Sequence, residues 1–212
     1  MKKINVLGIP FYRFFYDKNK IDGIVKKLEK LSYIQRRDSN FSFAEKEILV
    51  NGRNLHQFEE FKEIFNWFDE CLKQVKIDMS LTCDKLKICS SWANLNKPNQ
   101  SFHTHAHPNS FISCNYYASG WEKDKTVWIM HNPYFRGSNL YPVGKDSFEK
   151  NLFQIKHEEP TEPGKFIVFP STIDHYAMPN TASVDRYTIA ANVFPTGLIS
   201  ADSFSQIKIE VL

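Results

Sequence analysis

A short run of histidines is the part of this sequence best suited to chemistry. Three of the chain's seven histidines, His103, His105 and His107, alternate with other residues over five positions. If residues 101–107 form a β-strand, all three side chains project from one face, with about 6.6 Å between neighbours. Neutral imidazole is a common metal ligand. The spacing therefore predicts a metal site on one face of this strand.

Strand geometry limits which of these histidines can share one ion. His103 and His107 would lie about 13 Å apart on a regular strand, whereas each ligating nitrogen must come within about 2.0–2.1 Å of the metal. The pair is therefore either His103 with His105 or His105 with His107, and His105 belongs to both solutions. We expect the third ligand to be His175, because it follows a buried-looking strand at 165–170 and a tight turn.

The elements that must position these residues change in type along the chain. Apolar side chains recur at helical spacing over residues 19–33 and 56–76. From residue 84 onward, short β-type runs are separated by turn signals. We expect strands at 84–94, 101–107, 111–118, 126–132, 152–157, 165–170, 173–177, 185–194 and 203–212.

This pattern predicts a mainly β fold with N-terminal helices. Eight or nine antiparallel strands behind two helices suggest a jelly roll whose outer sheet is covered by the helices. A chain of 212 residues suits one domain. We therefore expect a single domain over 1–212, with helical N-terminal support at 1–80 and the β core at 84–212.

Composition excludes several classes of function. Lys and Arg exceed Asp and Glu by only 27 − 24 = 3, and no basic block suggests a nucleic-acid partner. No apolar run approaches the length of a membrane span, and the first residues do not resemble a signal peptide. The four cysteines show no paired spacing and are expected to be reduced thiols in a cytoplasmic protein. They are Cys71, Cys83, Cys89 and Cys114.

The order of several short motifs resembles the 2-oxoglutarate and Fe(II)-dependent oxygenase superfamily, in particular an oxygenase branch common in phages and marine bacteria. The resemblance covers roughly residues 85–195 and implies a double-stranded β-helix. Its specificity comes from the order and spacing of the motifs. These are Trp92-Ala93-Asn94, His105-Ala106-His107-Pro108-Asn109-Ser110, Ser113 to Tyr117, Pro163-Gly164 through Phe169-Pro170-Ser171 to His175, Pro179-Asn180, and Arg186 to Asn192.

The resemblance implies Fe(II) as the metal, with 2-oxoglutarate and O₂ as cosubstrates. The histidine two residues before Asn109 matches the family motif, which favours His107 over His103 as partner of His105. The iron ligands would then be His105, His107 and His175. One departure stands out, because the superfamily usually has Asp or Glu at the second position of the first pair, where this chain has histidine.

The resemblance also implies a binding site for 2-oxoglutarate. Arg186 would hold the distal carboxylate, since a guanidinium can grip a carboxylate through two parallel hydrogen bonds. Thr188 and Asn192 share its strand face. Tyr117 is the candidate phenol, with Tyr116 as its alternative.

Two other functions fit the same residues. One is a cupin-like enzyme with a three-histidine metal and no 2-oxoglutarate. The other is a non-enzymatic jelly-roll module that binds carbohydrate or belongs to a virion. The segment 132–150, rich in Tyr, Arg, Gly and Asn, is the expected loop for a primary substrate that the sequence does not identify. A phage-encoded enzyme would act in the host cytoplasm.

Overall fold

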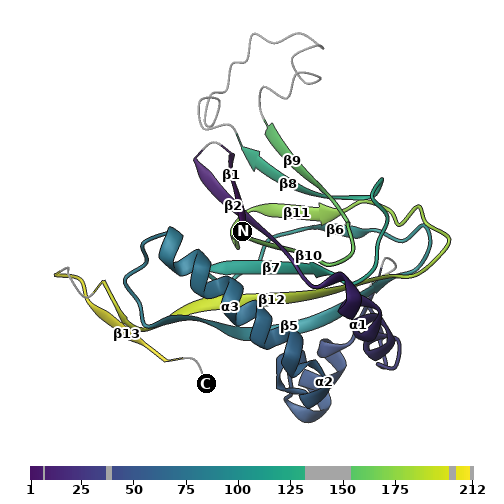
Figure 1. Ribbon diagram of the computed structural model, residues 1–212, viewed down its shortest axis with the longest axis horizontal. Helices are drawn as coiled ribbons and strands as arrows, with labels where there is room; N and C mark the ends of the chain where they lie inside the picture. The colour runs from purple at the N-terminus through teal and green to yellow at the C-terminus, as the bar shows by residue number, and fades with distance from the viewer. Residues whose placement is uncertain (7, 37–39, 132–153, 201–203, 211–212) are drawn as a thin grey trace, which may run out of the picture.

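Two antiparallel sheets form the framework of the chain, seen in a computed structural model that describes residues 1–6, 8–36, 40–131, 154–200 and 204–210 (Figure 1). Within these residues the larger sheet has the strand order β1-β2-β10-β7-β12-β5-β4-β3, with β13 paired to β12. The smaller sheet has the order β6-β11-β8-β9. The strands of the larger sheet are β1 (Lys2–Val6), β2 (Ile9–Phe15), β3 (Ile34–Arg36), β4 (Asn40–Ser42), β5 (Lys85–Asn96), β7 (Ile112–Tyr117), β10 (Lys165–Pro170), β12 (Arg186–Ile199) and β13 (Ile207–Ile209). Those of the smaller sheet are β6 (Phe102–His105), β8 (Lys125–His131), β9 (Gln154–Pro160) and β11 (Asp174–Ala177).

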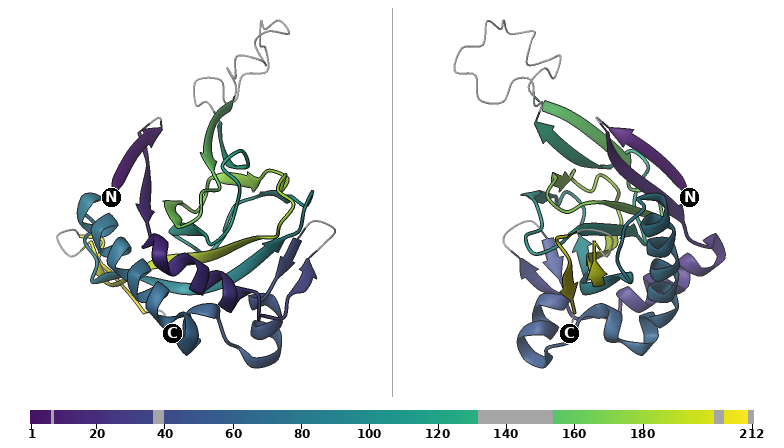
Figure 2. Two further views of the ribbon diagram at one scale, coloured as in Figure 1. Left: turned by 45° about the vertical axis from the view of Figure 1, so that its right-hand side comes forward. Right: turned by 90° about the vertical axis from the view of Figure 1, so that its left-hand side faces the viewer.

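The α-helices are α1 (Ile21–Leu28), α2 (Ala44–Asn51) and α3 (Lys62–Asp78), with short 3-10 turns at Lys18–Lys20, Leu55–Gln57 and Glu59–Phe61. Helices α1 and α3 lie on the side of the larger sheet that faces away from the smaller one (Figure 2). Residues of α2 border a cleft that residues of β6 also line. The apolar face of α3 packs on the sheet, where the ring of Phe68 stacks on Phe166 with centroids 4.1 Å apart. None of the helices among the described residues is long and apolar enough to cross a membrane.

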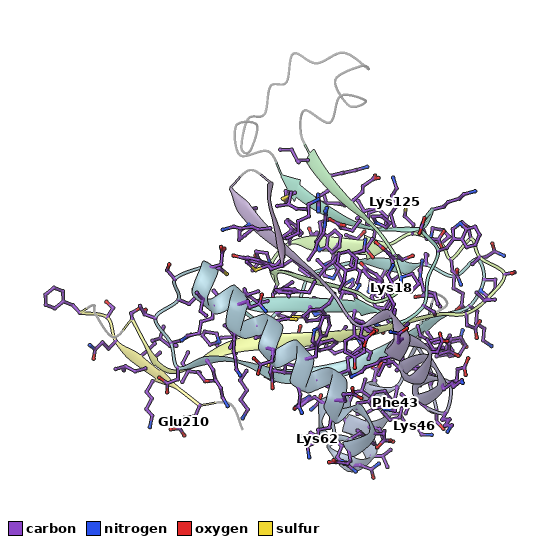
Figure 3. All side chains as sticks on the ribbon, viewed as in Figure 1. Lys18, Phe43, Lys46, Lys62, Lys125 and Glu210 are labelled. Carbon is purple, nitrogen blue, oxygen red and sulfur yellow. The ribbon has the colours of Figure 1, made fainter. Side chains whose placement is uncertain are left out.

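Strand β10 shows how one short run of residues builds two cores. Successive side chains of a strand point to opposite faces. Phe166 and Val168 therefore join the core under the helices, whereas Ile167 and Phe169 join a second core between the sheets. The second core also contains Trp128 from β8. Side chains fill the space between the two sheets (Figure 3).

A buried ion cluster joins β9 of the smaller sheet to β2 and β10 of the larger one. Glu159 is 2% exposed and accepts a hydrogen bond from Arg13 Nε at 2.6 Å. Its other carboxylate oxygen lies 3.5 Å from Lys165 Nζ, and the ring of His157 lies 2.8 Å from the first oxygen. Burial raises the pKa of Glu159, but the hydrogen bonds from His157 and Arg13 and the nearby positive charges lower it more, so its pKa lies below the usual value.

The predicted fold class is confirmed, with corrections in the first third of the chain. We expected residues 1–80 to be helical, but β1 to β4 lie within them and α2 was not predicted. The expected helix at 19–33 ends at Leu28, and the one at 56–76 begins as an α-helix only at Lys62. The physical reason is tertiary pairing, because β2 becomes a strand by pairing with β10, which is distant in the sequence. The expected substrate loop at 132–150 lies outside the described residues.

Candidate metal centre and its cavity

Three histidines from two strands and one loop converge in the space between the sheets. His105 on β6 and His175 on β11 are direct register partners. His107 lies just beyond the end of β6, and its backbone N–H donates to the carbonyl of Ser171 at 3.0 Å. One ligand atom from each of these histidines lies within 4.8 Å of the other two.

Backbone carbonyls orient two of the three rings. Nδ1 of His105 lies 2.9 Å from the carbonyl of His103, and Nδ1 of His175 lies 2.9 Å from the carbonyl of Ile173. A carbonyl only accepts, so Nδ1 carries the proton in each ring and Nε2 keeps its lone pair for a metal. Nε2 of His107 and Nε2 of His175 are 3.3 Å apart. Two nitrogens bound to one ion at about 2.0–2.1 Å lie roughly 3 Å apart, so this separation fits a shared metal.

His175 is neutral over the physiological pH range. Burial is the main cause that lowers its pKa to about 3; the neighbouring His105 and His107 act in the same direction, and the hydrogen bond to Ile173 opposes them. Neutral imidazole is the form that binds a metal. Among the described residues, the cluster around His175 contains no carboxylate, so the candidate ligand set is three imidazoles.

In the structure, His107 and not His103 lies close to both His105 and His175. His103 is not part of the convergent group, and its ring stacks on Phe102 with centroids 4.9 Å apart. The strand argument left both pairs open because it assumed a regular strand through residue 107. In fact β6 ends at His105, so the chain can turn and bring His107 back toward His175.

The three histidines share an internal cavity with Arg186. Arg186 and Thr188 are register partners of Asn96 and Asn94 on the neighbouring strand β5, and all four side chains line the cavity. The predicted alternation along β12 is thus present, with Arg186 and Thr188 on one face. The other described lining residues are Trp92, Phe102, Cys114, Asn115, Tyr117, Thr126, Thr161, Phe169, Ala177 and Ala190.

The guanidinium of Arg186 is buried, yet some of its N–H donors have no hydrogen-bond acceptor among the described residues. Its Nη2 donates to the carbonyl of Met178 at 2.8 Å, and its Nη1 lies 3.5 Å from Oδ2 of Asp124. Neither Nε nor Nη1 has a hydrogen-bond partner in the described part of the chain, and the residue is 1% exposed. Burial lowers the pKa of Arg186 while the charge of Asp124 raises it, and a guanidinium stays protonated. Unused donors on a buried cation are the arrangement that a carboxylate ligand would complete.

Asp124 is itself firmly held. Thr181 donates to its carboxylate through the backbone N–H, at 3.2 Å to Oδ1 and 3.0 Å to Oδ2, and through its hydroxyl at 2.6 Å to Oδ1. The carboxylate is 1% exposed beside Arg186. The pair is therefore a buried ion pair in which the acid has more hydrogen bonds than the base.

The two candidate tyrosines lie on opposite faces of β7. Tyr117 lines the cavity, and its hydroxyl donates to Thr126 Oγ1 at 2.8 Å. Burial raises its pKa to about 12, so the phenol is protonated. Tyr116 points into the core beneath the helices, 5.7 Å from the ring of Phe68. Of the two, only Tyr117 is placed to meet a ligand in the cavity.

Asn192 lies elsewhere than Arg186 and Thr188. It lines a separate outer cleft, and its Oδ1 accepts a hydrogen bond from Ser113 at 3.2 Å. A β-bulge follows it on β12. Its predicted contact with 2-oxoglutarate has no support from its position, since it does not line the cavity of Arg186.

Sequence reasoning missed several polar residues of the cavity. Asn94 and Asn96 alternate with Trp92 along β5, and this period-two pattern could have assigned them to one face. Asp124 gave no such signal, because it precedes β8 in a turn and meets Arg186 only through the fold.

Comparison with known proteins agrees with this geometry. A family model described as "Putative 2OG-Fe(II) oxygenase" matches residues 90–192. A search of the curated proteins gave no match.

Solved structures share the fold at low sequence identity. A Pseudomonas putida prolyl-4-hydroxylase is 12% identical with a TM-score of 0.56, and the match covers 88% of this chain and 93% of that one. HygX from Streptomyces hygroscopicus, with nickel and 2-oxoglutarate bound, is 10% identical with a TM-score of 0.60, covering 95% and 92%. The epimerase SnoN from nogalamycin biosynthesis, described as non-heme and alpha ketoglutarate dependent, is 9% identical with a TM-score of 0.61, covering 92% and 82%.

The matched segment contains all three convergent histidines and Arg186. The structural likeness adds the fold, a double-stranded β-helix with helices on its outer sheet. The family model and these solved structures together indicate a 2-oxoglutarate-dependent oxygenase.

Proposed function

We propose that this enzyme is a hydroxylase-type oxygenase in which His105, His107 and His175 hold Fe(II) and Arg186 binds the distal carboxylate of 2-oxoglutarate. One observation carries the proposal: a buried guanidinium with unused donors lies in the same cavity as the three histidines. A dicarboxylate can bind a metal at one end and a guanidinium at the other. The cavity therefore offers a partner for each end of 2-oxoglutarate.

The remaining lining residues suit an anionic cosubstrate. Among the described residues that line the cavity, Arg186 is the only permanently charged side chain, and none is acidic. Thr188 lies on the same strand face as Arg186, so its hydroxyl can donate to the same carboxylate. Tyr117 donates to Thr126, which leaves the hydroxyl proton of Thr126 available for a ligand.

When bound, Fe(II) and 2-oxoglutarate supply the redox chemistry, in which O₂ converts 2-oxoglutarate to succinate and CO₂ and delivers the second oxygen atom to the substrate. The chain's own residues orient the ligands and limit access of water. The ring of Phe169 lies 4.9 Å from that of His175, Phe102 lies 4.6 Å from His105, and Trp92 lies 5.5 Å from His107. These aromatic rings enclose the three imidazoles from several sides.

An outer cleft also reaches two of the three histidines. His105 and His107 line both the internal cavity and an outer cleft. The cleft is also bordered by exposed residues of α2, including Ile48 and Leu49. We infer that the primary substrate approaches the metal through this cleft, while 2-oxoglutarate occupies the cavity of Arg186.

Replacing Arg186 with alanine tests the proposed cosubstrate site. Hydrogen bonds to charged groups contribute about 1.5–3 kcal/mol each, so losing two should weaken 2-oxoglutarate binding by at least about 100-fold. Metal binding should be unchanged, because Arg186 is not one of the convergent ligands. Both affinities can be measured by anaerobic calorimetry, with Arg186→Lys as a control that keeps the charge but loses the planar fork. Equal 2-oxoglutarate affinity in the wild-type and alanine proteins would contradict the assignment.

The three-histidine ligand set also fits a cupin-like metal enzyme that does not use 2-oxoglutarate. The match to the oxygenase family model favours an enzyme that uses 2-oxoglutarate. Release of succinate from 2-oxoglutarate in the presence of iron and ascorbate separates the two, because only a 2-oxoglutarate-dependent enzyme forms succinate.

A further inference from the structure

A chain of three serine hydroxyl groups lies between the loop that carries His107 and the turn that precedes His175. Ser171 Oγ donates to Ser110 Oγ at 2.7 Å and lies 3.0 Å from Ser113 Oγ. Ser110 Oγ in turn lies 2.8 Å from the carbonyl of Ile112. Ser171 is 0% exposed and Ser113 is 1% exposed. The hydroxyls of Ser171 and Ser113 are therefore shielded from solvent and bond to neighbouring side chains, and half-buried Ser110 completes the chain.

The backbone of Ser171 forms hydrogen bonds to the same loop. Its carbonyl accepts from the N–H of His107 at 3.0 Å, and its own N–H donates to the carbonyl of Phe111 at 3.3 Å. Two residues later, the carbonyl of Ile173 accepts from Nδ1 of His175. Ser171 thus links the loop of one convergent histidine to the turn that orients another.

His107 depends on such contacts more than the other two histidines do. His105 and His175 are held by the ladder between β6 and β11. His107 lies in the connection between the end of β6 at His105 and the start of β7 at Ile112, where no strand fixes it. Asn109 in this connection adopts a left-handed conformation with φ of 56°, so the loop follows a specific, tightly turned path.

We propose that Ser171 is a positioning residue for the metal centre, whose hydroxyl holds the loop of His107 at the distance from His175 that metal binding requires. The proposal rests on the proposed function, because it takes His107 and His175 as ligands of one ion. The mechanism is preorganisation. A loop that must be ordered on binding lowers affinity, whereas a loop already held in place does not. Partners that hydrogen-bond directly to metal ligands typically change metal affinity by about 10–100-fold when they are replaced. The hydroxyl of Ser171 acts through the loop of His107, so we expect the lower end of this range.

Ser171→Ala removes the hydroxyl and keeps the backbone contacts. Ser91→Ala is the matched control, because Ser91 is also 0% exposed and its hydroxyl accepts from the N–H of His56 at 2.8 Å, away from the metal histidines. The probe is Co²⁺ in anaerobic calorimetry, with the absorption spectrum of bound Co²⁺ as a second readout of ligand geometry. We expect the Kd for Co²⁺ to rise about tenfold in Ser171→Ala and to stay unchanged in Ser91→Ala. At saturating Co²⁺, the affinity for 2-oxoglutarate should be the same in all three proteins.

The outcomes separate this inference from the proposed function. If the wild type binds no Co²⁺, the three-histidine centre itself is wrong. If the wild type binds Co²⁺ and Ser171→Ala binds it equally well, only the role of Ser171 is overturned. Equal weakening in both variants would also overturn it, since the effect would then be general destabilisation. Should Ser171→Ala fail to fold, Ser110→Ala removes a partner of the same hydroxyl at a half-buried position, and it should weaken Co²⁺ binding in the same direction.

Discussion

Replacing Asp124 with asparagine should destabilise the enzyme more without 2-oxoglutarate than with it. The carboxylate of Asp124 and the distal carboxylate of the cosubstrate would share one guanidinium, that of Arg186. Without cosubstrate, Asp124 is the only acidic partner of Arg186 in the described residues. With cosubstrate bound, a second carboxylate faces the same cation. The loss of Asp124 should therefore matter less in the bound state.

The size of the effect follows from the distance and the burial of the pair. Two unit charges 3.5 Å apart attract by about 5 kcal/mol at an effective dielectric constant of about 20. Removing one partner of a buried ion pair costs about 3–5 kcal/mol. Asparagine still offers Thr181 an acceptor, so we expect the lower end, about 3 kcal/mol, in the free energy of unfolding. For a chain of 212 residues this corresponds to a fall in Tm of about 6–12 °C.

Thermal melts of the wild type and Asp124→Asn, each loaded with Zn²⁺ and measured with and without 2-oxoglutarate, provide the assay. If the cosubstrate halves the loss to about 1.5 kcal/mol, linkage requires that the variant bind 2-oxoglutarate about tenfold more tightly than the wild type. Thr181→Val is the control, because it removes one hydrogen bond to Asp124 and leaves the charge. An identical loss with and without 2-oxoglutarate would refute the reasoning, since Arg186 would then not receive the cosubstrate's carboxylate.

Three further predictions concern the metal, the cavity and the buried ion cluster around Glu159. His107→Ala should abolish tight Co²⁺ binding in calorimetry while His103→Ala retains it, because only His107 belongs to the convergent group. Tyr117→Phe should weaken 2-oxoglutarate binding severalfold by disrupting the Thr126 hydroxyl, whereas Tyr116→Phe should leave binding and stability unchanged, because the Tyr116 hydroxyl has no partner among the described residues. Because the folded-state pKa of Glu159 lies below its usual value, its charge contributes stability that is present above about pH 4.5 and lost as pH falls through the folded pKa. Glu159→Gln should therefore flatten the acid side of the stability profile in urea melts between pH 3 and 7, and an unchanged slope would contradict the role given to this cluster.

What could be predicted from the sequence is what depends on local periodicity. Alternation along a strand placed Arg186 and Thr188 on one face. The same rule made His105 a member of both histidine pairs that could share a metal ion. The same rule could not choose between His103 and His107, because the choice depends on where β6 ends and how the chain turns. That turn is set by contacts with Ser171, which is more than sixty residues away in the sequence. The strands β1 and β2 escaped prediction for a related reason, since β2 is stabilised by pairing with the distant β10.

The position of Asp124 bears on the departure of this chain from the usual ligand pattern of the oxygenase superfamily that it resembles. Three neutral imidazoles leave a divalent ion with its full double positive charge. In the proposed site Arg186 adds one positive charge and Asp124 beside it adds one negative charge, so the site with its metal but without 2-oxoglutarate would carry a net double positive charge. Bound 2-oxoglutarate, a dianion, then brings the whole site to neutrality. If the metal had a carboxylate ligand and Arg186 had no acidic neighbour, the total charge of the site would be the same. Asp124 can therefore supply beside the guanidinium the negative charge that a carboxylate ligand would otherwise supply at the metal. This charge balance gives a reason why an acidic residue can lie next to an arginine that binds a carboxylate. It also gives a reason why Asp124→Asn should raise the affinity for 2-oxoglutarate.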